Sequence, residues 1–192
     1  LYNGIPTPHR EDASILVTDY YTEARLGCER VAELYNKLYG IDYAALRFFS
    51  VYGPHEKAKR SYANMISQFL WTMQAGNAPV VYGDGTQTRD FTFVRDVTEA
   101  MAMAASRGTG VFNLGTGKGV SVIEAIASFE RATGRKLKYT IAGRRAGDIE
   151  KIWADPSLAN RELGWKTVSS LDDAMKTAWE WEQYIRKKTE QQ

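Results

Sequence analysis

The chain has 192 residues, 44% of them hydrophobic, and a formal net charge of +2 at neutral pH. This composition suffices for a globular domain with a hydrophobic core and argues against collagenous, disordered and disulfide-built proteins. Acidic and basic residues are mixed, and no apolar run is long enough to span a bilayer, so we expect neither a nucleic-acid partner nor a membrane partner. The first residues lack the features of a signal peptide.

Cysteine and histidine usage predicts a cytoplasmic protein without a metal site. Cys28 is the only cysteine, and its place in a helical pattern predicts a small buried hydrophobic residue. A lone thiol is typical of a reducing compartment. His9 and His55 are far apart in the sequence and have no ligand-like neighbours, so we expect both at the surface and no bound metal.

The first predicted element is a long helix after a Pro-broken loop over residues 1–17. Thr18 or Asp19 can cap it, and Gly40 stops it after Tyr39. Its apolar residues recur at spacings of three and four; they are Tyr21, Ala24, Cys28, Val31, Tyr35 and Leu38. This narrow stripe needs another helix against it, either in the same subunit or in a second copy.

The rest of the chain alternates between strands and helices. Strands are predicted over residues 43–49, 79–82, 91–94, 111–114 and 137–141, the first of them buried. Helices are predicted over residues 62–74, 96–106, 121–134, 156–163 and 171–186, the third beginning with a Ser121–Glu124 capping box. The alternation predicts the α/β class.

The sequence contains no standard dinucleotide-binding or phosphate-binding loop. The nearest segment, residues 115–119 (GTGKG), has the wrong spacing for Gly-x-Gly-x-x-Gly and lacks the Gly-Lys-Ser/Thr of a Walker loop. We therefore interpret it as a tight turn before the Ser121 cap.

Tyr21 and Arg25 are one helical turn apart, so their side chains lie on one face. A tyrosine phenol is a weak base at neutral pH, and a fixed cation nearby favours the phenolate that general acid–base catalysis requires. Taken alone, this pair is more often structural than catalytic.

Seven motifs in a fixed order change that interpretation. They are Tyr21-x-x-x-Arg25 and residues 46–54 (LRFFSVYGP), 82–97 (YGDGTQTRDFTFVRDV), 112–117 (FNLGTG), 145–148 (RAGD), 154–157 (ADPS) and 162–165 (ELGW). Over nearly the whole chain this series resembles the extended short-chain dehydrogenase/reductase family, in particular the NAD-dependent epimerases and dehydratases similar to UDP-glucose 4-epimerase.

The resemblance implies the carboxy-terminal part of a Rossmann-like doubly wound parallel sheet, plus a small α/β substrate-binding domain. Residues 1–55 would end the dinucleotide-binding domain, and residues 56–192 would mainly bind the nucleotide sugar. The implied cofactor is NAD. Tyr21 matches the family's catalytic tyrosine, and Arg25 stands where the family normally has a lysine. Phe48 and Phe49 would border the nicotinamide with them.

On the substrate side, the resemblance assigns a nucleotide-diphosphate sugar. Arg89 and Arg145 match the two diphosphate-binding arginines, and two guanidinium forks suit a pyrophosphate. The other implied substrate residues are Ser50 beside the sugar, Asn64 at a phosphate, Val81 and Tyr82 at the base, and Asp148 at the ribose. Without the flanking motifs, surface salt bridges would be the simpler interpretation of the arginines.

The predicted activity is a UDP-glucose/UDP-galactose 4-epimerase that works by transient oxidation at C4, and the fragment alone is expected to be inactive. A 4,6-dehydratase or decarboxylase of the same family is one alternative. An inactive nucleotide-sugar-binding relative is another, and a structural dimerisation domain is a third. The family usually pairs through the tyrosine helix, so the apolar stripe fits a homodimer, although core packing would produce the same pattern.

Overall fold

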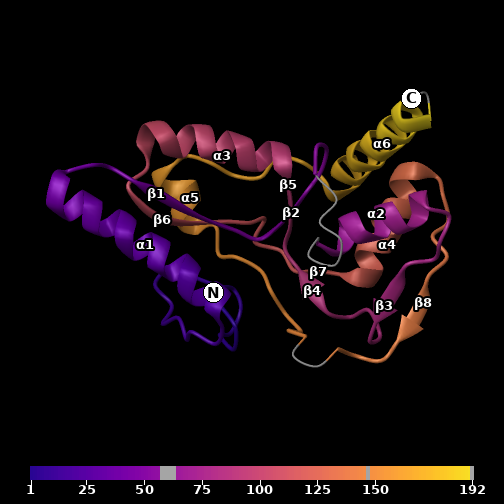
Figure 1. Ribbon diagram of the computed structural model, residues 1–192, viewed down its shortest axis with the longest axis horizontal. Coiled ribbons are helices and arrows are strands. Elements are labelled where there is room, and N and C mark those ends of the chain that lie inside the picture. Colours follow the sequence, from indigo (N-terminus) through magenta and orange to yellow (C-terminus); the bar gives the residue numbers. More distant parts are fainter. Residues whose placement is uncertain (57–63, 146–147, 191–192) are drawn as a thin grey trace.

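The computed structural model describes residues 1–56, 64–145 and 148–190. Figure 1 shows two groups of elements joined by short strands near the middle of the molecule. The first group comprises α1 (Tyr20–Tyr39), β1 (Ala44–Phe48), α3 (Val94–Arg107), β6 (Gly110–Leu114) and α5 (Ser157–Glu162). The second comprises α2 (Met65–Gln74), β3 (Val80–Tyr82), α4 (Val122–Thr133), β8 (Thr140–Ala142) and α6 (Leu171–Glu190). The joining strands are β2 (Ser50–Tyr52), β4 (Thr88–Arg89), β5 (Phe91–Phe93) and β7 (Val120–Ser121).

Parallel pairing dominates the described strands, which confirms the predicted α/β class. β1 pairs with β6 so that Leu46 lies opposite Phe112, and β2 pairs with β5 so that Val51 lies opposite Thr92. β3 and β8 are also parallel, whereas β4 and β7 are antiparallel. The division of the chain at residue 55 stays a prediction.

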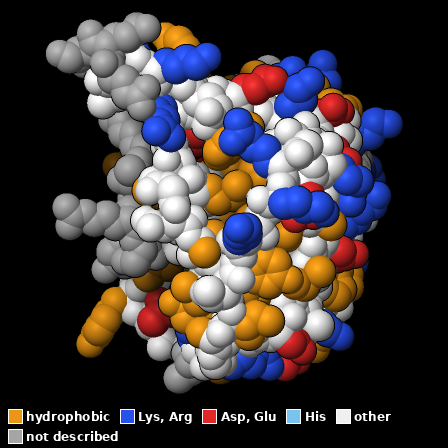
Figure 2. Space-filling model, turned by 90° about the vertical axis from the view of Figure 1, so that its right-hand side faces the viewer, with side chains coloured by type: hydrophobic (Ala, Val, Ile, Leu, Met, Phe, Trp, Pro, Cys, Tyr) orange, Lys and Arg blue, Asp and Glu red, His pale blue; other side chains and the backbone are white. Residues whose placement is uncertain are grey.

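Each group of elements has its own hydrophobic core. The first core lies between α3, β6 and α5 and centres on Trp165, Leu114 and Leu163. The second lies among α2, α4, α6 and the joining strands and contains Phe129 and Trp179 packed edge to face. Figure 2 views the molecule from the side of α6, β3 and β8, where apolar side chains gather among mixed charges. The joining strands thus lie between the two groups of elements and contribute to the second core.

The local signals of the long helix are confirmed. Asp19 is the N-cap residue, and its Oδ1 accepts a hydrogen bond from the Thr22 backbone N–H at 2.7 Å. Gly40 ends α1 in the left-handed conformation, with φ of 66°. The Ser121–Glu124 capping box at the start of α4 is likewise formed in both directions.

The prediction that Cys28 is buried is wrong, because the apolar stripe of α1 faces outward. Cys28 is exposed, as are the stripe residues Val31, Tyr35 and Leu38. The opposite face of α1 is polar, and Glu29 on it accepts two hydrogen bonds from the Arg47 guanidinium of β1, at 2.6 and 2.8 Å. An ion pair therefore joins this face of α1 to the sheet.

The prediction that His9 lies at the surface is also wrong. It is only 2% exposed, because its ring stacks on Tyr2 with 4.8 Å between centroids. Its backbone forms a parallel bridge to Ala154, donating to the Trp153 carbonyl and accepting from the Asp155 N–H. This pairing across the chain buries the ring. His55, by contrast, is exposed as expected.

Two strand predictions need correction. The strand predicted as buried over residues 43–49 is β1, and its side chains are half-buried with Phe48 exposed, since β6 is its only partner among the described residues. The strand predicted over residues 137–141 begins at Thr140, because Leu137 turns into the core and its N–H donates to Glu130 of α4. The first two residues of the predicted 62–74 helix lie outside the described residues.

We expect Glu182→Gln to raise the melting temperature at pH 8. Glu182 is 6% exposed, and its Oε1 accepts a hydrogen bond from Trp71 Nε1 at 3.1 Å. Burial raises the pKa of Glu182 above its ordinary value of 4.5, and the nearby Glu56 acts in the same direction. The charged form is thus disfavoured by folding, so wild-type stability falls as the pH rises above that value. Glutamine removes the charge and keeps the acceptor.

Thermal denaturation from pH 4 to pH 8 checks this expectation. The stability difference between Glu182→Gln and the wild type should be largest at pH 8 and disappear in acid, whereas Glu180→Gln, at an exposed position of the same helix, should change nothing. A Glu182→Gln protein less stable than the wild type at pH 8 would show that the buried charge is favourable.

Candidate functional site

A pocket of about 260 Å³ lies between β2, α2, β3 and β4. All the residues assigned to the substrate by the motif series line it, and they come from separate stretches of the chain. They are Ser50, Asn64, Val81, Tyr82, Arg89, Arg145 and Asp148. The fold therefore brings together residues that are up to 98 positions apart in the sequence (148 minus 50).

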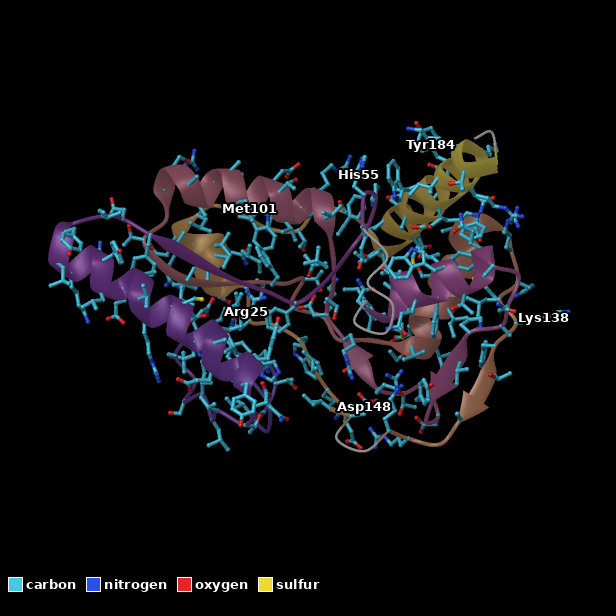
Figure 3. The ribbon with its side chains drawn as sticks, viewed as in Figure 1. Arg25, His55, Met101, Lys138, Asp148 and Tyr184 are labelled. Atoms are coloured by element: carbon cyan, nitrogen blue, oxygen red, sulfur yellow. The ribbon has the colours of Figure 1, made fainter. Side chains whose placement is uncertain are left out.

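Arg89 forms the most buried charged contact of the pocket. Its guanidinium donates to the Asp148 carboxylate at 2.6 Å and to the Ile149 carbonyl at 2.7 Å. Burial lowers the pKa of Arg89, and Asp148 opposes that shift by attraction. Asp148 lies on the segment that runs from β8 back toward the first group of elements, as Figure 3 shows. The pair fixes a cation and an anion side by side at the pocket wall.

Arg145 lies over an aromatic ring. Its guanidinium carbon is 3.8 Å from the centroid of the Tyr82 ring, a cation–π contact. Arg145 is exposed and Tyr82 is half-buried, so the contact sits at the mouth of the pocket. Val81, the neighbour of Tyr82 on β3, belongs to the second hydrophobic core, and its backbone lies opposite Ile141 of β8.

Asn64 serves the fold as well as the pocket. Its Oδ1 accepts from the Ser67 N–H and caps α2, while its Nδ2 donates to the Val51 carbonyl at 2.6 Å. These bonds tie the start of α2 to β2. An Asn before an apolar helical run is a capping signal, but the prediction of a helix over residues 62–74 places Asn64 inside it and does not use that signal.

Gln87 is a pocket residue that sequence reasoning missed. It is nine-tenths buried, and its Nε2 donates to the Tyr82 carbonyl at 2.7 Å. Its Oε1 has no hydrogen-bond partner among the described residues. The bond to Tyr82 spans five positions and crosses a turn, and no local sequence signal marks such a contact. Gln87 thereby supports the strand end that carries the Tyr82 ring.

The predicted catalytic pair lies on α1 and does not line this pocket. Tyr21 is 69% exposed, and the Arg25 guanidinium carbon lies 5.0 Å from its ring centroid. The neighbouring Tyr20 is 97% exposed. Arg25 extends from α1 toward the middle of the molecule in Figure 3. The geometry thus places a cation on the face of the Tyr21 ring.

Of the residues predicted beside the nicotinamide, Phe48 ends β1 and Phe49 follows it. Phe49 packs near Tyr2 and His9, with centroid distances of 6.1 and 6.2 Å, and Phe48 is exposed. Tyr2 donates to Asn113 and accepts from Arg47, so the aromatic group is held from two strands. This arrangement gives Phe49 a rigid backing.

The glycine-rich turn over residues 115–117 is explained by Asp90. The Asp90 carboxylate is fully buried and accepts from the N–H groups of Thr116, Gly117 and Ala154 and from the Thr116 hydroxyl. A side chain at Gly115 would collide with this carboxylate, and Gly117 has φ of 77°. The residues after β6 thus form a tight turn, as the interpretation from spacing predicted, and Asp90 joins this turn to Ala154.

The predicted cofactor residues suit the nicotinamide end of NAD but not its diphosphate. Tyr21, Arg25, Phe48 and Phe49 could border a nicotinamide, but the sequence contains no glycine loop to hold the diphosphate of NAD. Within the described ranges no group of three or more His, Cys, Asp or Glu residues could hold a metal ion. None of the helices in those ranges combines the length and hydropathy needed to cross a membrane.

Proteins of known function resemble this chain in amino-acid sequence. Residues 3–115 match the NAD dependent epimerase/dehydratase family. The UDP-glucuronate 4-epimerase of Thermodesulfobacterium geofontis is 31% identical over 94% of this chain and 56% of its own length. The UDP-glucose 4-epimerase of Bacillus subtilis is 31% identical over 93% of this chain and 57% of its own length.

A solved structure of a related protein has a similar fold. The UDP-glucose 4-epimerase from Stenotrophomonas maltophila, with bound NAD and formylated UDP-arabinopyranose, superposes with a TM-score of 0.86 and 32% identity. The match covers 97% of this chain and 61% of that one. The chain thus spans a little over half the length of these relatives.

Proposed function

Because this chain belongs to the NAD dependent epimerase/dehydratase family, we propose that it is the nucleotide-sugar-binding part of a 4-epimerase that interconverts UDP-glucose and UDP-galactose. The observation that carries the proposal is the convergence of all the motif-derived substrate residues in one pocket. The relatives named above are 4-epimerases of nucleotide sugars at about 30% identity, which supports the reaction class.

The diphosphate is proposed to lie between Arg89, Arg145 and the N-terminus of α2. Both arginines line the pocket, and Asn64 and Met65 bring the first turn of α2 to it. Guanidinium forks bind phosphate oxygens with charge-assisted hydrogen bonds. The N–H groups and the dipole of a helix N-terminus favour the same negative charge. The pocket therefore offers its positive potential on two sides.

The nucleoside is proposed to lie against β3. The Tyr82 ring offers a flat surface for the base, and the adjoining Val81 also lines the pocket. Asp148 uses Oδ1 for Arg89, and its Oδ2 can accept a ribose hydroxyl. Ser50 is proposed to face the sugar from the start of β2.

Tyr21 is proposed to take the proton from the C4 hydroxyl and to return it after the sugar has turned. The Arg25 guanidinium lies beside Tyr21, with its carbon 5.0 Å from the ring centroid. NAD, held by segments that this sequence does not contain, would supply the hydride acceptor. Anchoring the diphosphate while the sugar rotates keeps the oxidised intermediate in place.

An inactive nucleotide-sugar-binding relative is the second candidate, and Arg25 favours it. Arginine supplies a charge and donors where the family normally has lysine, but its planar fork has a different reach and does not release a proton. Binding without turnover in an otherwise complete enzyme would support this candidate.

We expect Arg89→Ala to weaken UDP binding by about 10- to 100-fold. The substitution removes charge-assisted hydrogen bonds worth about 1.5–3 kcal/mol and leaves Asp148 without its partner, so the pocket becomes more negative. Isothermal titration with UDP measures the change. Arg161→Ala, which breaks an exposed ion pair on α5, is the matched control and should leave UDP affinity unchanged. A wild-type chain that does not bind UDP, or an Arg89→Ala chain that binds it equally well, would overturn the proposal.

A further inference from the structure

One arginine of the pocket covers the surface proposed to receive the base. The Arg145 guanidinium lies 3.8 Å from the centroid of the Tyr82 ring. A cation over an aromatic face is held by the negative potential of that face. A base that stacks on the same face must therefore displace the guanidinium.

The charged residues near Arg145 form ion pairs with one another, so they do not draw its guanidinium away from the Tyr82 ring. Arg144 pairs with Glu150, and its stem packs against Gly83. Asp148 pairs with Arg89. No ion pair of Arg145 occurs within the part of the chain that the structure describes. The Tyr82 ring is thus the contact that holds its guanidinium.

We propose that Arg145 is a specificity-determining residue that makes base binding depend on the diphosphate. The inference rests on the proposed function, because it takes the base at Tyr82 and the diphosphate at the arginines. A nucleoside diphosphate gives the guanidinium a stronger partner than the ring, so Arg145 moves to the phosphates as the base takes its place. A bare nucleoside offers no such partner and must compete with the cation for the ring. The site thereby binds nucleoside diphosphates more tightly than it binds nucleosides.

Titrations of UDP and uridine into the wild type and Arg145→Ala test the proposal, with ligand-observed NMR for the weak uridine complex. Arg145→Ala should bind UDP about 10- to 100-fold more weakly, because a charge-assisted contact is lost. The same variant should bind uridine about two- to five-fold more tightly, because the ring is uncovered. A residue that only binds phosphate would leave uridine affinity unchanged.

Two further variants locate the effect. Arg144→Ala removes the adjacent arginine and should leave uridine affinity at the wild-type value. Tyr82→Leu removes the ring, so adding Arg145→Ala to it should give no gain in uridine affinity. Both results are expected if the cation–π contact is the barrier.

The outcomes separate the two proposals. If Arg145→Ala weakens UDP but leaves uridine unchanged, weaker or undetected, the inference is overturned while the UDP site stands. A gain in uridine affinity that persists in the Tyr82→Leu background also overturns the inference. If the wild type does not bind UDP, the proposed function fails, and the inference fails with it.

Discussion

Tyr21→Phe is expected to lower turnover by about 10²- to 10⁴-fold in an enzyme that carries this chain together with a dinucleotide-binding half. The substitution removes only the hydroxyl, so the ring and its contact with Arg25 are kept. Proton transfer at the C4 hydroxyl then loses the group proposed as its acid and base, while the pocket residues are untouched. Steady-state kinetics with UDP-galactose and a parallel UDP titration measure the two effects separately.

The adjacent tyrosine provides the matched control. Tyr20 precedes Tyr21 in α1 and is 97% exposed. Tyr20→Phe should leave turnover unchanged, and both variants should bind UDP as tightly as the wild type does. Full turnover in Tyr21→Phe would exclude Tyr21 as the acid and base and would return the Tyr21–Arg25 pair to a structural role.

Asp90→Ala is expected to lower the free energy of unfolding by about 3–5 kcal/mol, a large part of the stability of a domain. The buried carboxylate accepts hydrogen bonds from two separate segments, residues 116–117 and Ala154. Alanine leaves three N–H groups without this acceptor, that of Ala154 buried and those of Thr116 and Gly117 partly buried, and each unsatisfied buried group costs about 1–3 kcal/mol. Chemical denaturation followed by circular dichroism measures the change.

Asp90→Asn keeps the measurement possible if the alanine variant does not fold. One oxygen can still accept from Thr116, but the amide NH₂ then meets another donor, so an intermediate loss is expected. Asp42→Ala, at an exposed position, should change stability little. Wild-type stability in Asp90→Asn would show that Asp90 does not hold this junction.

Local sequence signals predicted the helices well. Asp19, Gly40 and the Ser121–Glu124 box act through hydrogen bonds that span a few residues, so their outcome does not depend on the rest of the fold. Strand ends were predicted less well. The chain between α4 and β8 packs Leu137 into the core before it pairs, and only the neighbouring helices determine that choice.

The motif series predicted which residues would meet, but not how they would be engaged. All the residues assigned to the substrate line one pocket. Their present partners were not foreseen: Arg145 lies on Tyr82, Asn64 caps α2 and Asp148 pairs with Arg89. The side-chain pairings join segments far apart in the chain, and no local pattern encodes them.

By itself the sequence determined the α/β class, several helix caps and seven of the residues that line the pocket, because these follow from local hydrogen bonding, hydrophobic periodicity and ordered motifs. Only the tertiary structure decided which face of each element is covered. Periodicity shows that α1 has an apolar stripe but not where it points; in the fold Glu29 faces Arg47 of β1, while the stripe with Cys28 faces outward. In the same way, pairing with Ala154 buries His9. Burial depends on neighbours distant in the chain, and so it emerges only when the whole fold is assembled.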